Sequence, residues 1–282
     1  MPTKIIRKEE LIPGRTSLML LDAPRIAAAA RPGNFVMLRV SENGERFPLT
    51  IADADAEAGV ISIVFLVMGK STDALNHMGD GDSIADVCGP LGRPTHIEKV
   101  GTVICSGGGT GIAAMHHIAK GHHRAGNHVV AVIGARSENL LLFRKELESF
   151  CPEVLIATDD GSAGRKGLVT EALEERLRAD SSVREVVAVG PVPMMRAVVG
   201  TVKPFNRPVT VSLNAMMVDG MGMCGACRVS VGGQTRFTCV DGPEFDGNLV
   251  DFDELQKRLA SFKDQEKISH DLYREQQCGC RS

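Results

Sequence analysis

From about Gly101 onward, buried strands alternate with helical segments. The apolar runs VGTVICS, HVVAVIGA, EVLIATDD, EVVAVG and PVTVSLN are each followed by a turn or a helical stretch. Strands that are apolar on both faces are typical of a parallel sheet covered by helices on both sides. The repeats predict a doubly wound parallel α/β domain that binds its ligands at the carboxyl edge of the sheet. We expect this domain to span residues 99–213.

Residues 1–98 follow a different pattern. Short β-rich runs, SLMLLD, NFVMLRV, FPLTIAD and VISIVFLVMG, are separated by turn residues. Such spacing predicts an antiparallel sheet, closed as a small β-barrel. One helical stretch, Ser71 to Met78, interrupts the strands, and we expect it to plug an end of the barrel.

Residues 214–282 show neither pattern. A loop that contains cysteines comes first, and a charged helical tail with few apolar positions follows. We expect the tail to pack on a surface of the protein or on another subunit. The chain therefore divides into a β-barrel, an α/β domain and a C-terminal segment of loop and tail.

Four potential metal ligands lie in this glycine-rich loop. Asp219, Cys224, Cys227 and Cys239 have the spacing D-x4-C-x2-C-x11-C. It matches the C-x4-C-x2-C…C pattern of two-iron ferredoxins, with aspartate in place of the first cysteine. We predict that these residues bind a [2Fe-2S] cluster, because the glycines let the chain wrap closely around it. A zinc clip with one distant cysteine is the alternative, although zinc loops rarely need so many glycines.

The first strand-to-helix turn of the α/β domain is rich in glycine. Its sequence, CSGGGTGIA, includes Gly108, Gly109 and Thr110. Glycines between a strand and a helix let a pyrophosphate approach the backbone N–H groups at the start of the helix. Because Ile112 occupies the last glycine position of G-x-G-x-x-G, a tight turn without a ligand is the alternative.

Two later strands end at the same carboxyl edge. One ends at Asp159 and Asp160, and the next ends at Gly190. The two carboxylates are suited to ribose hydroxyls and would repel a 2′-phosphate, which favours NADH, whereas Arg136 would attract such a phosphate. The choice between NADH and NADPH therefore stays open, and a helix-capping turn is an alternative role for the aspartates.

In the barrel, two positions carry suitable chemistry for a flavin. Thr50 offers a hydroxyl to the flavin ring. Lys70, with the backbone amides of Ser71 and Thr72, offers a site for a diphosphate. Without further information these positions are a strand entry and a helix cap.

Other reactive side chains are interpreted as structural. Histidines lie on several faces of one helix and its exit, so we expect a solvated helix end rather than a metal site: His116, His117, His122, His123 and His128. Cys88, Cys105 and Cys151 are expected to be buried filler. Cys278 and Cys280 are assigned no role.

Charge and hydropathy exclude some functions. The net charge of −3 and the pI near 6.3 offer no basic surface for nucleic acid. The N-terminus lacks the apolar core of a signal peptide, and no apolar run approaches the length of a bilayer span. The sequence therefore predicts a cytoplasmic protein that binds neither nucleic acid nor membrane.

The whole chain resembles the ferredoxin–NADP reductase superfamily, in the branch that contains the electron-transfer subunits of dihydroorotate dehydrogenase. The segments that carry the resemblance are RFPLTIAD, GKSTDAL, GPLG, CSGGGTGIAA, TDDGSAGRKG, GPVPMM and VDGMGMCGACRV. Within that branch they are most similar to the small subunits of NADH-dependent reduced ferredoxin:NADP oxidoreductases, or sulfide dehydrogenases. The resemblance covers residues 1–255.

This resemblance implies three cofactors: FAD in the barrel, NAD(H) on the sheet, and a [2Fe-2S] cluster with an aspartate ligand. By position, it implies FAD contacts from Arg46, Pro48, Leu49, Thr50, Lys70 and Thr72. It implies NAD(H) contacts from Gly108, Gly109, Thr110, Asp159 and Gly190. No side chain is implied as a catalytic acid or base, since hydride passes directly between stacked rings.

The implied function is that of the electron-transfer subunit of an electron-bifurcating oxidoreductase. The implied partner is a larger subunit with flavin and [4Fe-4S] clusters, through which ferredoxin is reached. The alternatives are the electron-transfer subunit of NAD-dependent dihydroorotate dehydrogenase, against which Asp219 argues, and a redox-sensing module without turnover.

Overall fold

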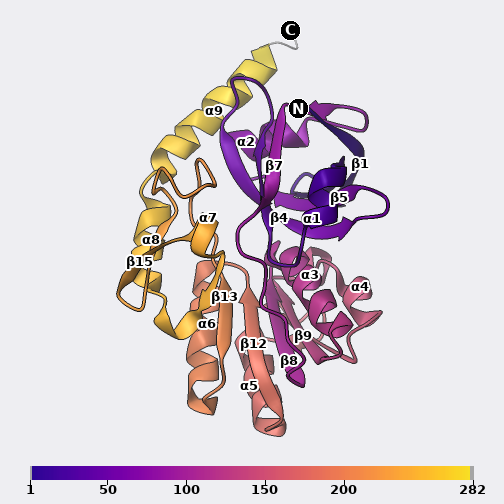
Figure 1. Ribbon diagram of the computed structural model, residues 1–282, viewed down its shortest axis with the longest axis vertical. Coiled ribbons are helices and arrows are strands. Elements are labelled where there is room, and N and C mark those ends of the chain that lie inside the picture. The colour runs from indigo at the N-terminus through magenta and orange to yellow at the C-terminus, as the bar shows by residue number, and fades with distance from the viewer. Residues whose placement is uncertain (1, 280–282) are drawn as a thin grey trace.

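The first half of the fold is an antiparallel β-barrel. The computed structural model describes residues 2–279, with side chains up to residue 276. Its first sheet has the order β6-β1-β2-β5-β4-β3-β7 and curls into a nearly closed barrel, drawn in indigo and purple in Figure 1. The strands are β1 (Thr3–Ile12), β2 (Thr16–Asp22), β3 (Phe35–Arg39), β4 (Arg46–Asp55), β5 (Val60–Leu66), β6 (Ser83–Ile84) and β7 (Asp86–Leu91).

Alternation along the strands builds the barrel core. Leu21, Ile61 and Ile63 are fully buried, while their neighbours along each strand are less covered. Strand β1 was not among the predicted runs, because the charged stretch Arg7–Glu10 leaves it little apolar alternation. The predicted plug helix is α2 (Lys70–Asn76), and a second short helix in this region, α1 (Pro24–Ala29), was not predicted.

The second sheet is parallel except at one edge. Its order is β11-β10-β9-β8-β12-β13-β16, and only the β13–β16 pair is antiparallel. The strands are β8 (Thr102–Gly108), β9 (His128–Ala135), β10 (Glu153–Thr158), β11 (Arg165–Lys166), β12 (Val183–Val189), β13 (Val209–Ser212) and β16 (Glu244–Asp246). The strand order reverses between β8 and β12, which places a topological switch point there. The predicted fold class, a barrel followed by a doubly wound sheet, is confirmed.

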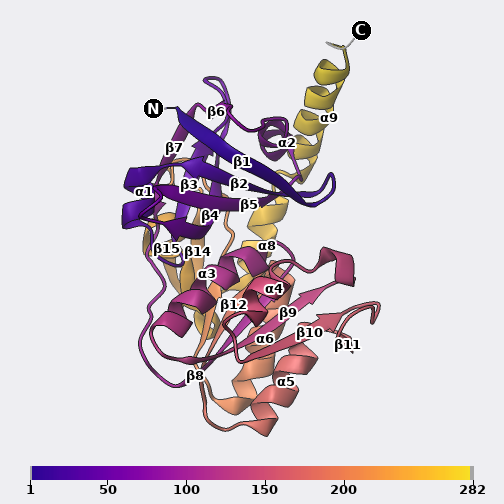
Figure 2. The same ribbon diagram turned by 90° about the vertical axis from the view of Figure 1, so that its right-hand side faces the viewer.

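Helices cover both faces of this sheet. One face carries α3 (Gly111–Arg124) and α4 (Arg144–Glu148), and the other carries α5 (Val169–Ala179) and α6 (Val192–Val202). Figure 2 shows α3 between the sheet and the barrel, so this helix belongs to the boundary of the two halves. The connection after β9 contains little helix: a 3₁₀ turn (Glu138–Leu140) precedes α4, which is a single turn of α-helix.

The C-terminal segment returns to both halves. After Cys227 come β14 (Arg228–Val231), β15 (Gln234–Phe237), α7 (Thr238–Asp241), which contains Cys239, and β16, then α8 (Phe252–Ala260) and α9 (Lys263–Gly279). Helix α9, in yellow, runs beside the barrel in Figure 1. Its His270 Nε2 lies 2.7 Å from Asp73 Oδ2 of α2, and Arg274 Nε donates to the same oxygen at 3.2 Å. The tail therefore packs on the barrel surface, one of the two places predicted for it.

Burial corrects the interpretation of the histidines. His116, His117 and His122 of α3 are buried, so the predicted solvated helix end is wrong for these three. The reason is tertiary: α3 lies between the sheet and the barrel and is covered on opposite faces.

The three isolated cysteines differ in burial. Cys105 and Cys151 are buried as predicted, but Cys88 is exposed on β7, so its prediction as buried filler is wrong. Cys280 and the side chain of Cys278 lie outside the described residues.

Glu244 of β16 is expected to make stability depend on pH. Its Oε1 accepts a hydrogen bond from Thr95 Oγ1 at 2.7 Å, and burial, with a smaller contribution from Glu185, raises its pKa to about 7 from 4.5. As pH rises through this window the unfolded chain ionises first, so stability is highest below pH 4.5 and falls until about pH 7.

Glu244→Gln is expected to remove this loss, which is about 2 kcal/mol for a partly exposed carboxyl. Urea unfolding at pH 5.5 and pH 8 would measure it. The control is Glu57→Gln, because Glu57 is exposed. This variant should lose as much free energy of unfolding between pH 5.5 and pH 8 as the unchanged protein. An equally large loss in Glu244→Gln would contradict the assignment of this pH dependence to Glu244.

Candidate functional site

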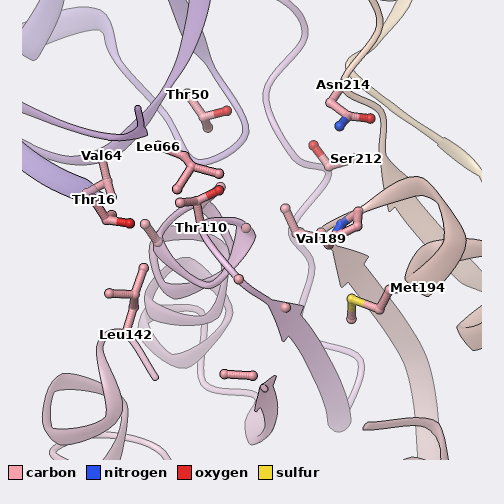
Figure 3. A pocket seen from close by; sticks show the side chains of 18 of the residues that line it. Thr16, Thr50, Val64, Leu66, Thr110, Leu142, Val189, Met194, Ser212 and Asn214 are labelled. Carbon is pink, nitrogen blue, oxygen red and sulfur yellow. The ribbon is translucent and has the colours of Figure 1, made fainter. Parts of the chain in front are cut away.

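A cavity of about 820 Å³ lies between the barrel and the carboxyl edge of the parallel sheet. Its walls come from β4 and β5 of the barrel and from the ends of β8, β9, β10, β12 and β13. In Figure 3, Thr50 of the barrel and Thr110 at the start of α3 face the same space, and Ser212 and Asn214 approach it from the sheet side. Its size and its place at the switch point are typical of a binding site for a large organic ligand.

Most of the predicted nucleotide contacts line this one cavity. They come from both halves of the fold: Pro48, Leu49, Thr50, Thr72, Gly108, Gly109, Thr110, Asp159 and Gly190. The tertiary structure thus brings together residues that are up to 142 positions apart in the chain.

Two predicted contacts do not line the cavity. Arg46 is exposed at the start of β4. Lys70 borders a separate shallow hollow, where its Nζ lies 3.5 Å from Glu45 Oε1 and where Ser71 Oγ donates to the same carboxylate at 3.0 Å. The neighbouring Glu45 therefore already satisfies part of the positive charge that was assigned to a diphosphate.

Thr72 caps the start of α2. Its Oγ1 accepts hydrogen bonds from the amides of Met68 (3.0 Å) and Gly69 (3.2 Å) and donates to the Gly69 carbonyl at 3.1 Å. These bonds fix the loop that leads from β5 into α2. Thr72 therefore shapes the cavity wall through the backbone as well as by its own surface.

The glycine-rich turn has close neighbours on two sides. Gly109 has a φ of +56°, which favours glycine, and Thr110 precedes the first residue of α3. Met194 of α6 covers the turn, since a Cβ at Gly108 or Gly190 would lie 2.7 Å or 2.6 Å from its Sδ. The start of α3 thus faces the cavity beside a flexible thioether.

The two adjacent aspartates have different environments. Asp159 lines the cavity, as does Arg136 at the end of β9. Asp160 instead accepts hydrogen bonds from the Ser162 hydroxyl at 2.6 Å and the Ser162 amide at 2.9 Å, and these bonds lower its pKa. Asp160 thus closes a turn, and of the two carboxylates it is Asp159 that lines the cavity.

Sequence reasoning missed part of the cavity wall. Ser212 ends β13, Asn214 and Met217 follow it, and Arg15 and Thr16 belong to the β1–β2 hairpin. A signal existed for the first group, because β13 ends at the same carboxyl edge as the strands that carry Gly108 and Gly190. The hairpin residues gave no signal, since only closure of the barrel brings them to the cavity.

The cysteine loop places its four predicted ligands in two pairs. Cys227 Sγ and Cys239 Sγ are buried and lie 3.2 Å apart. Burial of the Cys239 thiol, together with its hydrogen bond to Cys227, raises the pKa of Cys239 to about 12. The Asp219 carboxylate accepts the amide of the exposed Cys224 at 2.7 Å. Among the described residues, no three His, Cys, Asp or Glu side chains converge on one metal ion. A two-iron cluster, with two protein ligands for each iron, fits two pairs.

Asp219 also organises the loop around itself. Its Oδ1 accepts the Met221 amide at 2.8 Å and its Oδ2 accepts the Met223 amide at 3.0 Å, and the Met221 bond contributes most to holding its pKa below the usual value. Backbone amides directed at an acceptor form an anion-binding concavity. Three thiols, a carboxylate and inward amides are a suitable donor set for an iron–sulfur cluster.

The loop is packed against the barrel. Gly220 has a φ of +76°, and a Cβ there would lie 2.6 Å from Met37 of β3 and 3.1 Å from Leu91 of β7. The residue paired with Met37 on β4 is Pro48, which lines the cavity. The cysteine loop therefore lies one strand away from the cavity wall.

Of the helices in the described part of the chain, none is both long enough and apolar enough to cross a bilayer.

Two protein-family models match the chain. Residues 106–200 match the oxidoreductase NAD-binding domain, and residues 214–251 match the iron–sulfur cluster binding domain of dihydroorotate dehydrogenase B. The first match contains the glycine-rich turn and Asp159, and the second contains all four predicted cluster ligands.

Curated relatives align along most of the chain. A dihydroorotate dehydrogenase B (NAD(+)) electron transfer subunit homolog of Thermotoga maritima is 48% identical, covering 90% of this chain and 89% of the relative. A protein of Clostridium beijerinckii known by its position in the adh 3′ region is 40% identical, covering 99% and 98%. The electron transfer subunit of dihydroorotate dehydrogenase B from Bacillus caldolyticus is 34% identical, covering 85% and 94%.

Solved structures share the architecture. The structure of an NADH-dependent reduced ferredoxin-NADP oxidoreductase, studied for flavin-based electron bifurcation, superposes with a TM-score of 0.91 at 44% identity, covering 97% of this chain and 98% of the other. A ferredoxin NADP+ reductase from Neisseria gonorrhoeae, with bound FAD and NADP, has a TM-score of 0.58 at 13% identity, covering 73% and 91%, which shows the fold alone.

Proposed function

Because the chain belongs to the family of dihydroorotate dehydrogenase B electron-transfer subunits, we propose that it serves as the electron-transfer subunit of an electron-bifurcating NADH-dependent ferredoxin:NADP oxidoreductase. It is an oxidoreductase subunit with an NAD-binding domain and an iron–sulfur domain. We assign residues 1–98 to FAD, 99–213 to NAD(H), and 214–282 to the cluster and tail. One observation carries the proposal: Asn214, Ala215 and Met217 line the cavity, and this stretch of chain leads directly to Asp219.

Different residues of the cavity bind and orient different parts of the cofactors. When bound, FAD exchanges hydride with NAD(H) and passes electrons singly to a [2Fe-2S] cluster. Thr50 presents its hydroxyl to the cavity from the barrel, and Pro48 and Leu49 form an apolar wall beside it. Gly109 and Thr110 give the phosphates of a nucleotide access to the start of α3, and Asp159 offers its carboxylate to ribose hydroxyls.

The cluster loop passes electrons out of the chain. Asp219 with Cys224, and Cys227 with Cys239, supply two ligands for each iron. Val218, Met221 and Met223 around them are more than half exposed, and Met223 is 83% exposed. This surface suits a larger partner subunit with flavin and [4Fe-4S] clusters, through which ferredoxin exchanges electrons.

Asp219 distinguishes this proposal from the dihydroorotate dehydrogenase subunit, a second candidate that the names of the curated relatives favour. Asp219→Cys is expected to keep the cluster and to shift its midpoint potential, because a thiolate replaces the carboxylate at one iron and the three amide hydrogen bonds that Asp219 accepts are lost. A potentiometric titration followed by electron paramagnetic resonance would measure the shift. An unchanged potential with an intact cluster would refute a role for Asp219 as ligand.

Native purification without oxygen tests the function itself. The expected result is a complex with a larger chain that contains flavin and iron–sulfur clusters. A partner that contains FMN and oxidises dihydroorotate would instead assign the chain to pyrimidine synthesis. Flavin-loaded protein that fails to reduce a dye with NADH would indicate a redox-sensing module.

A further inference from the structure

Helix α3 connects the two halves of the cavity. Ala113 and Ala114, in its first turn, line the cavity on the nucleotide side. One turn further along the same face, His117 Nδ1 lies 3.0 Å from the carbonyl oxygen of Ile51 in β4. Lys120 continues this face and lies 2.5 Å from Asp53 Oδ2 of the same strand. The spacing 113, 117, 120 is that of one helix face.

The acceptor lies at an irregularity in the barrel. The pairing of β4 with β5 shifts between Ile51 and Asp53, so that Ala52 is an extra residue on β4. Such a bulge bends the strand and interrupts the ladder. Ile51 is fully buried, so its carbonyl has no access to water, and the His117 ring supplies a hydrogen bond there.

The bond fixes the tautomer of His117. A carbonyl oxygen can only accept, so Nδ1 carries the proton. Burial lowers the pKa of His117, which keeps the ring neutral. The histidine is therefore a neutral donor, whose hydrogen bond joins the flavin strand to the nucleotide helix.

We propose that His117 is a positioning residue: by holding the bulge of β4 against α3, it sets the alignment of the barrel half of the cavity with the sheet half. This inference rests on the proposed function for its two ligands. Thr50, one residue before Ile51, and Thr110, two turns before His117, both line the cavity. A shift of α3 relative to β4 would therefore move two contacts apart while leaving each half intact.

The test compares two substitutions of similar shape. His117→Asn keeps an N–H donor near the position of Nδ1, and His117→Leu removes it. His116→Leu is the matched control, because His116 is also buried in α3 but packs between Phe143 and Phe150 of the α/β domain, with ring centroids 5.0 Å and 5.6 Å away.

The first readout is the long-wavelength charge-transfer absorption of NAD+ stacked on reduced flavin, measured with the affinities for FAD and NAD+. His117→Leu is expected to keep both affinities within about twofold and to lose about tenfold in charge-transfer intensity and hydride-transfer rate, because small misplacement of reacting groups is costly. His117→Asn and His116→Leu are expected to stay near the unchanged protein. A Leu variant with full intensity, or an Asn variant as impaired as Leu, would overturn the inference.

The second readout does not depend on the proposed function. Hydrogen exchange of the flavin-free chain is expected to rise about tenfold in residues 46–55 and 107–118 of His117→Leu, but not in residues 183–202. If the unchanged protein shows no charge transfer, the proposed function fails, and this comparison still decides the positioning claim. Should His117→Leu not fold, His117→Ala replaces it, and unchanged exchange in both segments of that variant refutes the proposal.

Discussion

Cys227→Ala is expected to remove the iron–sulfur cluster from the protein. Cys227 is buried, and its Sγ lies 3.2 Å from that of Cys239, so no other side chain in the described part of the loop can replace it beside that thiol. Iron content should fall from about two atoms per chain to nearly none, and visible absorption of the cluster should disappear. Reduction of a one-electron acceptor should fall about a hundredfold, while hydride exchange with NADH in the barrel–sheet cavity should persist.

The matched control is Cys88→Ser. Cys88 is exposed on β7, on the strand that the loop packs against, and it is not a predicted ligand. Its substitution should leave the iron content unchanged. Full iron content in the Cys227 variant would contradict the ligand assignment. Zinc instead of iron in the unchanged protein would support the zinc clip.

Gly111→Ala is expected to impair both stability and nucleotide binding. A Cβ at Gly111 would lie 2.6 Å from the Val189 carbonyl oxygen and 2.7 Å from Gly190 Cα, and backbone atoms cannot move aside cheaply. The start of α3 would have to shift away from β12, and the glycine-rich turn would shift with it. We expect a loss of about 2 kcal/mol in the free energy of unfolding and about tenfold in NADH affinity.

Glycine-to-alanine substitutions at other positions distinguish a steric clash of the added Cβ from the general effect of replacing glycine by alanine. Gly200 lies in α6 with no heavy atom within 4 Å of an added Cβ, so Gly200→Ala should be neutral or slightly stabilising. Gly190→Ala is an intermediate case, because the nearest atom is the flexible Met194 Sδ at 2.6 Å. Urea unfolding and calorimetric titration with NADH would measure all three variants. Equal losses in Gly111→Ala and Gly200→Ala would contradict the steric argument.

Features that depend on local spacing could be predicted from the amino-acid sequence alone. Five apolar strands separated by helices required a covered parallel sheet, and Gly108 to Thr110 marked its first carboxyl-edge turn. Asp219, Cys224 and Cys227 lie within nine residues, so their common loop followed from chain geometry alone. These predictions succeed because each signal and its consequence lie within one or two elements.

Contacts between distant segments were decided by the tertiary structure. Lys70 pairs with Glu45 rather than facing the cavity, while Thr16 and Asn214 reach it from opposite halves of the fold. The sequence predicts His117 as one of several solvated histidines, but α3 lies between sheet and barrel, where His117 binds the carbonyl of Ile51 beside a bulge. Residue types and periodicity define which faces are buried, but the partner of a buried polar group depends on how two separately folded layers meet.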